Sequence, residues 1–267
     1  MAITSYLYQI LITLKKKELT SLGKTNSILE IGEQNWYGDV SFQDLMKVVD
    51  SYCNEKNKAI LNKKLKDIIA LTESGKHPKL FSFDVAKIFY KTIFDYKEYL
   101  ALDLHGTKDS INFDLNNDYK DLKRYNVVTN IGTSEHIFNQ LAVFKTIHNS
   151  VEAGGLIIHQ LPGQGYYDHG FYNYQPTFFF DLALANNYFM VGFWMYDNNK
   201  NDLINVHNRE NYSKMFDRKN HPTYYDNIVI FKSPDKKKED FKLPTQYIYS
   251  NQKISPEEKK RWDINKK

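Results

Sequence analysis

The sequence predicts an α/β protein whose doubly wound, mostly parallel sheet carries helices on both faces. Strand-like and helix-like patterns alternate along the chain, which is typical of strands joined by helical crossovers. The first strand-like stretch, Ser27–Ile31, is an aliphatic run that closes on Glu30, as in a strand buried on both faces. Gly32 follows, and a glycine there lets the backbone turn close to a ligand. We therefore expect a ligand site at the carboxyl end of this strand.

The chain on either side of this strand is predicted to be helical. Apolar residues at helical spacing predict an opening helix over 6–14, with Gly23 as its C-cap. Three further helical patterns separate the first strand from the next, over residues 42–49, 60–69 and 85–94. Because one helix suffices to join neighbouring parallel strands, we interpret about Ser41 to Lys79 as a helical insertion. It either covers the ligand at the carboxyl ends of the strands or is a surface elaboration.

The rest of the chain continues the alternation. Six further strands are predicted, over residues 99–104, 111–115, 125–131, 156–161, 188–196 and 227–231. A long amphipathic helix should start at Glu135 and end at Gly154-Gly155, and another is predicted over 176–187 with Pro176 in its first turn. A capping-box pattern at Ser255 predicts a short terminal helix. We expect a single domain over residues 1–267, with a charged extension from about 235 to 267.

Composition limits the classes of protein to consider. The formal net charge is +4, and the lysines are spread along the chain with no dense arginine face, which argues against nucleic-acid binding. The single cysteine, Cys53, excludes an intramolecular disulfide and a cysteine-rich metal site. The apolar stretch near the N-terminus is too short to cross a bilayer, and its charges follow it, the reverse of a secretory signal. We therefore expect a cytoplasmic enzyme without a membrane span.

Five short motifs, taken in order, resemble those of a known family. They are Leu29–Gly32, Leu102–Leu104, Phe113–Asn116, Val128–His136 and Gly154–Leu156. Over about residues 27–161 they are similar to the strand-end motifs of class I (Rossmann-like) S-adenosylmethionine-dependent methyltransferases. The resemblance implies a seven-stranded sheet whose last strand is antiparallel, and S-adenosyl-L-methionine as the cofactor.

The chain departs from the family's usual Gly-x-Gly-x-Gly after the first strand. Only Gly32 is kept, with Gln34 and Trp36 at the other two positions. A nicotinamide dinucleotide would need the later glycines to admit its pyrophosphate. S-adenosylmethionine has no pyrophosphate, so the change argues against a dinucleotide more than against a methyltransferase.

The resemblance also implies which residues hold the cofactor. Asp103 ends a strand where its carboxylate can take both ribose hydroxyls, although a solvated strand-end carboxylate is the alternative. Glu30 is buried by its neighbours and needs either the cofactor's ammonium group, through water, or a nearby backbone amide. The full predicted set, with the adenine site and the opposite wall, is Glu30, Gly32, Gln34, Asp103, Phe113, Asp114, Leu115, Asn130, Gly132 and Thr133.

The segment from His159 to Pro176 combines histidines, an aspartate and several tyrosines. We expect it to be a loop after the fifth strand that forms the acceptor side of the pocket, because functional groups often lie on loops held by a rigid scaffold. Its aromatic rings could wall a sugar or another planar acceptor. A catalytic base is predicted among His159, Asp168 and His169, with Asp168 orienting an imidazole. The alternative is that these side chains only pack the loop.

A metal site is the weaker interpretation of the histidines. Glu135-His136, His148 and His159 include residue types that bind divalent ions. Glu-His at this point is common in the methyltransferases that the chain resembles, without a metal, and His148 lies toward the far end of the predicted helix. We therefore expect no metal.

The leading hypothesis is an S-adenosylmethionine-dependent methyltransferase that acts on a small-molecule or glycan-like acceptor. The alternative is a non-catalytic relative that keeps the fold as a binding or structural module; the reduced glycine motif favours it, and Asp103 and Asp114 oppose it. Nucleic-acid methylation ranks third, because the chain lacks a basic face and the Asn/Asp-Pro-Pro-aromatic tetrapeptide of base methylation.

Overall fold

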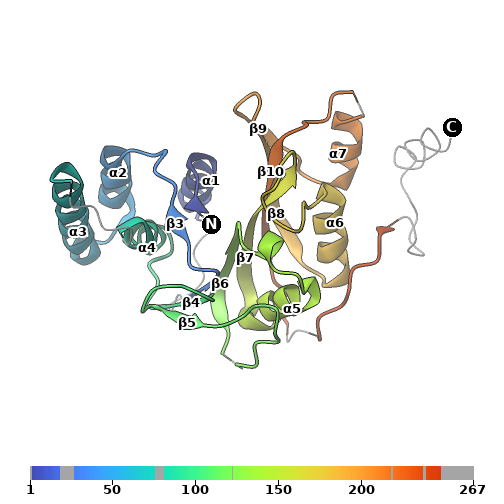
Figure 1. Cartoon of the computed structure of the whole chain (residues 1–267), viewed down its shortest axis with the longest axis horizontal. Coiled ribbons are helices and arrows are strands. Elements are labelled where there is room, and N and C mark those ends of the chain that lie inside the picture. The colour runs from blue at the N-terminus through green and yellow to red at the C-terminus, as the bar shows by residue number, and fades with distance from the viewer. Residues whose placement is uncertain are drawn as a thin grey trace. The chain divides into compact units, whose positions relative to one another are not determined.

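A computed structural model describes residues 2–18, 27–75, 81–121, 123–217, 219–236 and 239–247. The chain divides into two compact units, coloured by residue number in Figure 1. The first unit comprises residues 1–114 and 125–127, and the second comprises residues 115–124 and 128–267. One strand, β6 (Tyr125–Ile131), contributes its first three residues to the first unit and the others to the second.

The first unit contains the parallel strands that the sequence predicts. β5 (Ser110–Asn112), β4 (Glu98–Asp103) and β2 (Ser27–Ile31) lie side by side in that order, followed by the start of β6. β2 pairs with β4, and β4 with β5, in parallel, and every residue of β2 is buried. A separate parallel pair joins β1 (Ala2–Ile3) to β3 (Asn35–Trp36). The carboxyl ends of β2 and β4 carry four of the predicted cofactor residues, namely Glu30, Gly32, Gln34 and Asp103.

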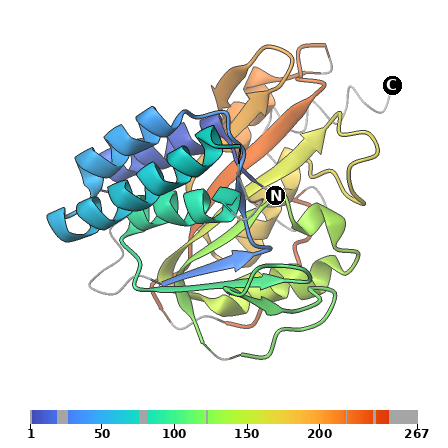
Figure 2. The ribbon, with the colours of Figure 1, turned by 60° about the vertical axis from the view of Figure 1, so that its left-hand side comes forward.

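Four helices complete the first unit: α1 (Ser5–Lys16), α2 (Phe42–Tyr52), α3 (Glu55–Glu73) and α4 (Phe81–Phe94). The predicted insertion forms α2 and α3, which pack against α4 (Figure 2). α3 begins beside Asp95, which accepts hydrogen bonds from Asn54 and Asn57 and precedes β4. The start of α3 thus lies near the amino end of β4. The predicted cap at Gly23 is wrong, since α1 ends at Lys16; Gly23 itself lies outside the described residues.

The second unit completes the sheet with the remainder of β6 and four more strands. In the order of pairing, these are β7 (Val151–Gln164), β10 (Tyr225–Lys232), β8 (Phe189–Asp197) and β9 (Asp202–Asn205). β10 runs antiparallel to both β7 and β8, which confirms the expected antiparallel last strand. β9 is antiparallel to β8 and was not predicted, so the described sheet has eight strands where seven were expected.

The helices of this unit differ from the prediction at one important point. Among the residues that the structure describes, they are the 3₁₀ helix η1 (Ser134–His136), α5 (Gln140–Ser150), α6 (Pro176–Ala185) and the unpredicted α7 (Arg209–Met215). The expected continuous helix from Glu135 is wrong, because Ile137 is extended and Asn139 caps a new helix by accepting from the Ala142 N–H. That break leaves Glu135 and His136 on a short turn after β6.

Two more element boundaries differ from the prediction. Gly154-Gly155 lies within β7 and does not end a helix, and β7 continues to Gln164. The segment predicted as a loop from His159 therefore begins inside a strand, and the loop proper starts at Gly165. The terminal helix predicted at Ser255 lies outside the described residues.

Candidate functional site

In the first unit, Asp103 lies at the end of β4 with its carboxylate half-buried. Its Oδ2 accepts the Glu33 backbone N–H at 2.9 Å and its Oδ1 accepts that of His105 at 2.8 Å. Each carboxylate oxygen has about two lone-pair directions, so one direction on each oxygen stays available. Phe113 is half-buried and donates its N–H to the Asp103 carbonyl at 3.0 Å, and Asp114 is exposed beside it. This arrangement fits the ribose and adenine of a nucleoside.

Glu30 is fully buried in β2. Its Oε2 accepts the Gln34 backbone N–H and the Tyr99 hydroxyl, each at 2.8 Å. Of the two partners expected for this carboxylate, the structure supports the backbone amide. Burial raises the pKa of Glu30 to about 8, despite the two hydrogen bonds. Glu30 therefore stabilises the turn after β2 by accepting the Gln34 backbone N–H.

The turn after β2 explains why two glycines of the family motif can be absent. Gly32 has φ +74°, the left-handed conformation that favours glycine, whereas neither Gln34 nor Trp36 has a positive φ. The Gln34 side chain is buried; it donates to the Gly32 carbonyl at 3.1 Å and accepts from the Tyr90 hydroxyl at 2.6 Å. Gln34, predicted as a cofactor residue, is thus held by contacts within its own unit.

Glu33, which the sequence analysis did not single out, is also buried in this turn. Its Oε1 lies 2.8 Å from the Lys87 ammonium and accepts from the Thr107 hydroxyl at 2.7 Å, and its Oε2 accepts the Thr107 N–H at 2.5 Å. The carboxylate is therefore fully paired within the fold. No local sequence signal marked it, because Lys87 and Thr107 come from distant segments.

The second unit holds the other predicted cofactor residues on the turn after β6. Gly132 has φ +61° and donates its N–H to the Gln160 carbonyl at 2.9 Å. Asn130 is buried, and its side chain fixes η1 through the Ser134 hydroxyl at 2.9 Å and the Ser134 N–H at 3.2 Å. Thr133 and Leu115 are buried as well. Asn130, Gly132 and Thr133 shape the turn that presents Glu135 and His136, whereas Leu115 follows β5.

His159 does not fit its predicted role as a catalytic base. It lies inside β7, fully buried, with ring contacts to Phe144, Phe179 and Phe231. Its Nδ1 is 3.2 Å from the Asn130 amide nitrogen, and burial lowers the pKa of the imidazole to about 3. An imidazole enclosed by three phenylalanines serves packing, so this candidate is withdrawn.

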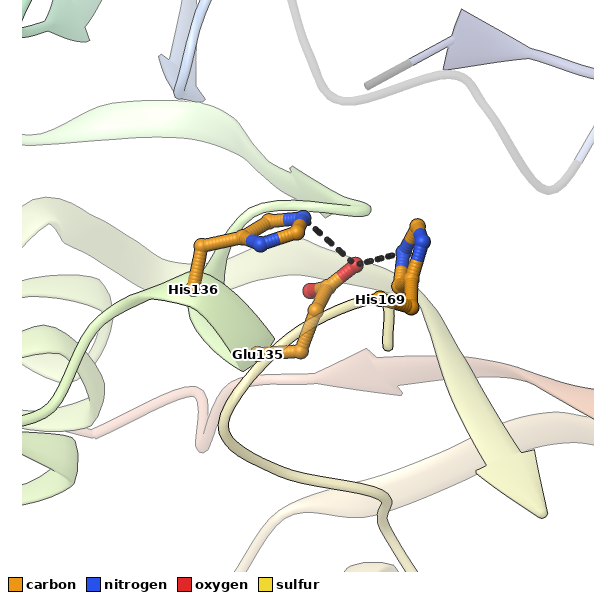
Figure 3. A group of neighbouring side chains, drawn as sticks. All are labelled: Glu135, His136 and His169. Carbon is orange, nitrogen blue, oxygen red and sulfur yellow. Dashed lines mark ion pairs between the residues drawn. The ribbon is translucent and has the colours of Figure 1, made fainter. Parts of the chain in front are cut away.

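Glu135, His136 and His169 form a cluster that the sequence did not predict as a unit (Figure 3). Nε2 of His169 lies 3.6 Å, and Nε2 of His136 3.8 Å, from Oε1 of Glu135. The Glu135 side chain is 1% exposed, whereas each imidazole is 43% exposed. Neither Glu135 oxygen has a hydrogen-bond partner among the described residues, and burial raises the pKa of this carboxyl to about 7. A buried carboxylate here faces two imidazoles that reach the surface.

The loop after β7 is bound to the turn after β6 by its backbone. The N–H groups of Phe171 and Tyr172 both donate to the Glu135 carbonyl, at 2.8 and 3.2 Å. Gly170 allows this approach, since a Cβ there would lie 2.9 Å from the Glu135 carbonyl oxygen and 3.2 Å from Nδ1 of His136. The position of His169 next to Glu135 is therefore set by hydrogen bonds and by a glycine.

A pocket of about 380 Å³ opens beside the cluster. It is lined by His136, Asp168, His169, Gly170 and Phe171. Asp168 is exposed, with φ +54°, and the carboxylate that faces the His169 imidazole is that of Glu135. Among the described residues, Asp168 makes no ion pair or hydrogen bond with an imidazole, so its predicted orienting role lacks support. The Phe171 ring is 68% exposed and supplies an apolar wall.

Fold and strand-end groups define the class as a Rossmann-like α/β protein. The family described as "Methyltransferase domain" matches residues 36–221, well over half of the chain. The chain belongs to this family, which confirms the resemblance found in the sequence. It is a methyltransferase, and S-adenosylmethionine is the methyl donor that this membership assigns. The match begins at Trp36, so Glu30, Gly32 and Gln34 lie outside it.

Several solved structures are similar in fold. One is a Burkholderia thailandensis 1,6-didemethyltoxoflavin-N1-methyltransferase, with 8% identity, a TM-score of 0.46, and coverage of 85% of this chain and 78% of that one. A putative sarcosine dimethylglycine methyltransferase from Galdieria sulphuraria has 9% identity, a TM-score of 0.44, and 85% coverage of each chain. The N-methyltransferase NodS from Bradyrhizobium japonicum has 9% identity, a TM-score of 0.42, and coverage of 85% and 94%. At these identities, no acceptor is transferred to this chain.

A comparison with curated proteins gives no match. Within the described part of the chain, no helix is long and apolar enough to cross a membrane.

Proposed function

We propose that the protein methylates a small-molecule acceptor, which can include a sugar, bound beside Glu135, His136 and His169. The pocket of about 380 Å³ that includes both imidazoles in its lining carries this proposal. Small-molecule sites have volumes of about 300–1,000 Å³ and combine apolar walls with a few polar groups. Phe171 offers such a wall, on which a planar ring or a sugar can pack.

The residues of the first unit support S-adenosylmethionine as the donor. Asp103 keeps a lone-pair direction on each oxygen for the ribose hydroxyls, and Phe113 and Asp114 offer an apolar face and a carboxylate for adenine. When bound, this donor supplies an electrophilic methyl group whose bond to sulfur breaks as the bond to the acceptor atom forms. The residues present therefore fit the nucleoside half of the cofactor.

The cluster supplies the polar groups that a hydroxyl acceptor requires. Holding the acceptor in line with the methyl group accounts for much of the rate of such a transfer. A hydroxyl must also lose its proton, and the pocket lining offers His136, Asp168 and His169 for this, of which the two imidazoles belong to the cluster. Of the three predicted bases, His169 alone belongs to it.

The test is the release of S-adenosylhomocysteine with a panel of phenols, aromatic amines and monosaccharides. His169→Ala should lower turnover by roughly 10²–10⁴-fold, the scale for groups that handle a proton in the transition state. Affinity for S-adenosylmethionine, measured by calorimetry, should stay nearly unchanged, because no predicted cofactor residue is altered.

The matched control is His207→Asn, which removes another exposed histidine of the same unit. His207 has φ +58°, a conformation that asparagine tolerates, so this variant should keep the turnover of the parent. Equal turnover in His169→Ala and the parent would contradict the placement of the acceptor. Absence of S-adenosylmethionine binding would instead favour the non-catalytic binding module.

A further inference from the structure

We propose that Glu135, His136 and His169 bind a divalent transition-metal ion. Two imidazoles and one carboxylate are a donor set that such ions accept, with further positions left open for water or an acceptor. Within the described residues, this is the one group of three or more metal-binding side chains whose ligand atoms converge. The metal-free expectation from the sequence is revised here, because it considered His148 and His159 instead of His169.

The distances between the ligand atoms support an ion. Zn–N and Zn–O bonds are about 2.0–2.2 Å long, so two ligand atoms of one ion lie at most about 4.2–4.4 Å apart. The separations of 3.6 and 3.8 Å from Oε1 of Glu135 are within this limit and too long for hydrogen bonds. All three atoms lie within 4.8 Å of one another, and small rotations of the half-exposed imidazoles would bring the two nitrogens into range.

Glu135 provides the second, independent observation. Its side chain is buried, it points between the two imidazoles (Figure 3), and both of its oxygens lack hydrogen-bond partners among the described residues. A buried carboxylate without hydrogen bonds is costly, and a cation at this point would remove the cost. The buried carboxylate of Glu33 differs, because the Lys87 ammonium group pairs with it.

The backbone of the cluster is already organised for a shared ligand. Phe171 and Tyr172 bind the Glu135 carbonyl, so the loop that carries His169 is fastened to the residue that would be its fellow ligand. The other two histidines considered from the sequence are excluded by their contacts. His148 meets the Tyr188 hydroxyl at 2.6 Å and the Glu239 carbonyl at 2.9 Å, and His159 is enclosed in the core.

The ion would lie beside the acceptor pocket, and its part in methyl transfer rests on the proposed function. A bound divalent ion lowers the pKa of an oxygen that it coordinates, which would favour an acceptor hydroxyl over other acceptors. Metal binding itself does not depend on the acceptor or on turnover, so the two ideas are tested separately.

The experiment uses the full chain, treated with a chelator, desalted, and titrated with ZnCl₂ and then with MnCl₂ by calorimetry. We expect at least one of the two metals to bind, with a stoichiometry of one ion per chain. Glu135→Gln, His136→Ala and His169→Ala should each weaken binding by at least about 10–100-fold, the loss seen when even the partners of metal ligands are removed. His207→Asn should bind like the parent. The two alanine variants alter half-exposed side chains, so they should fold even if Glu135→Gln does not.

Binding of neither metal, or equal affinity in parent and ligand variants, would overturn the proposal. Binding of a primary alkylamine in place of both metals would also overturn it, since Glu135 would then pair with an ammonium group. In another outcome, the ion binds as expected while the chelator-treated protein methylates as fast as the metal-loaded protein. That result would exclude a catalytic role of the ion. Metal binding without turnover on any acceptor would leave the site standing while the proposed function fails.

Discussion

The turn after β2 and the turn after β6 begin alike and end differently. Each starts with an Ile-Gly pair whose glycine has a left-handed backbone, φ +74° at Gly32 and +61° at Gly132. Each glycine donates its N–H to a carbonyl of another strand, at 2.8 and 2.9 Å. A buried glutamate follows in both turns, Glu33 in the first and Glu135 in the second. The two turns therefore share their backbone conformation and differ in the side chains that surround the glutamate.

The partners of the two carboxylates differ. Glu33 has the Lys87 ammonium at 2.8 Å and two hydrogen bonds from Thr107. Among the described residues, the ion-pair partners of Glu135 are the more distant imidazoles of His136 and His169. Burying a charge is unfavourable unless it is paired and hydrogen-bonded. The first turn meets this requirement within the fold. We propose that a ligand meets it in the second turn, and we place the chemistry there for this reason.

The largest expected effect tests whether the pairing of Glu33 with Lys87 stabilises the fold. Lys87→Met removes the cation but keeps the volume, which leaves Glu33 buried without its charge partner. We expect a loss of about 3–5 kcal/mol in the free energy of unfolding, the usual cost of breaking one side of a buried pair. Glu135→Gln should cause no such loss, because no hydrogen bond within the described structure is broken. Urea denaturation of both variants measures this; similar losses would mean that the two turns do not differ.

A smaller effect tests the cofactor side of the first turn. Asp103→Ala should weaken S-adenosylmethionine binding by about 1.5–3 kcal/mol, the scale of charged hydrogen bonds lost. Asp109→Ala is the matched control. It removes a nearby carboxylate that is not a predicted cofactor residue and that pairs with Lys87, as Glu33 does. Calorimetry with the cofactor compares the two. Unchanged affinity in Asp103→Ala would move the ribose contact elsewhere.

The last effect is a dependence of stability on pH that comes from Glu30 and is spread over several pH units. Its pKa is raised from 4.5 to about 8 in the folded protein, so the folded state holds more protons than the unfolded state between these values. Stability from this group is therefore fully present below about pH 4.5, falls as the pH rises to about 8, and stays level above. The slope is at most about 1.4 kcal/mol per pH unit. Glu30→Gln should reduce the slope in urea denaturations from pH 5 to 9, where Glu135 also titrates, and parallel curves would contradict the assignment.

Much of the fold could be predicted from local patterns. The aliphatic run at β2, the strand over residues 125–131 and the helix that begins at Pro176 are marked by short stretches of sequence, because periodicity and turn residues act over a few positions. The antiparallel last strand followed from the family resemblance, and β10 confirms it. The strand β9 was missed because four residues are too few to show a period, and the helix α7 was missed because most of its residues are polar.

The candidate site depended on tertiary structure. His159 and His169 look alike as residues in a polar, tyrosine-rich stretch, yet one is enclosed by three phenylalanines and the other reaches a pocket. Glu135 meets His169 only because two backbone N–H groups of the loop bind the Glu135 carbonyl and Gly170 leaves room for that approach. Burial and pairing of a charge are set by segments far apart in the chain, and local periodicity carries no information about them.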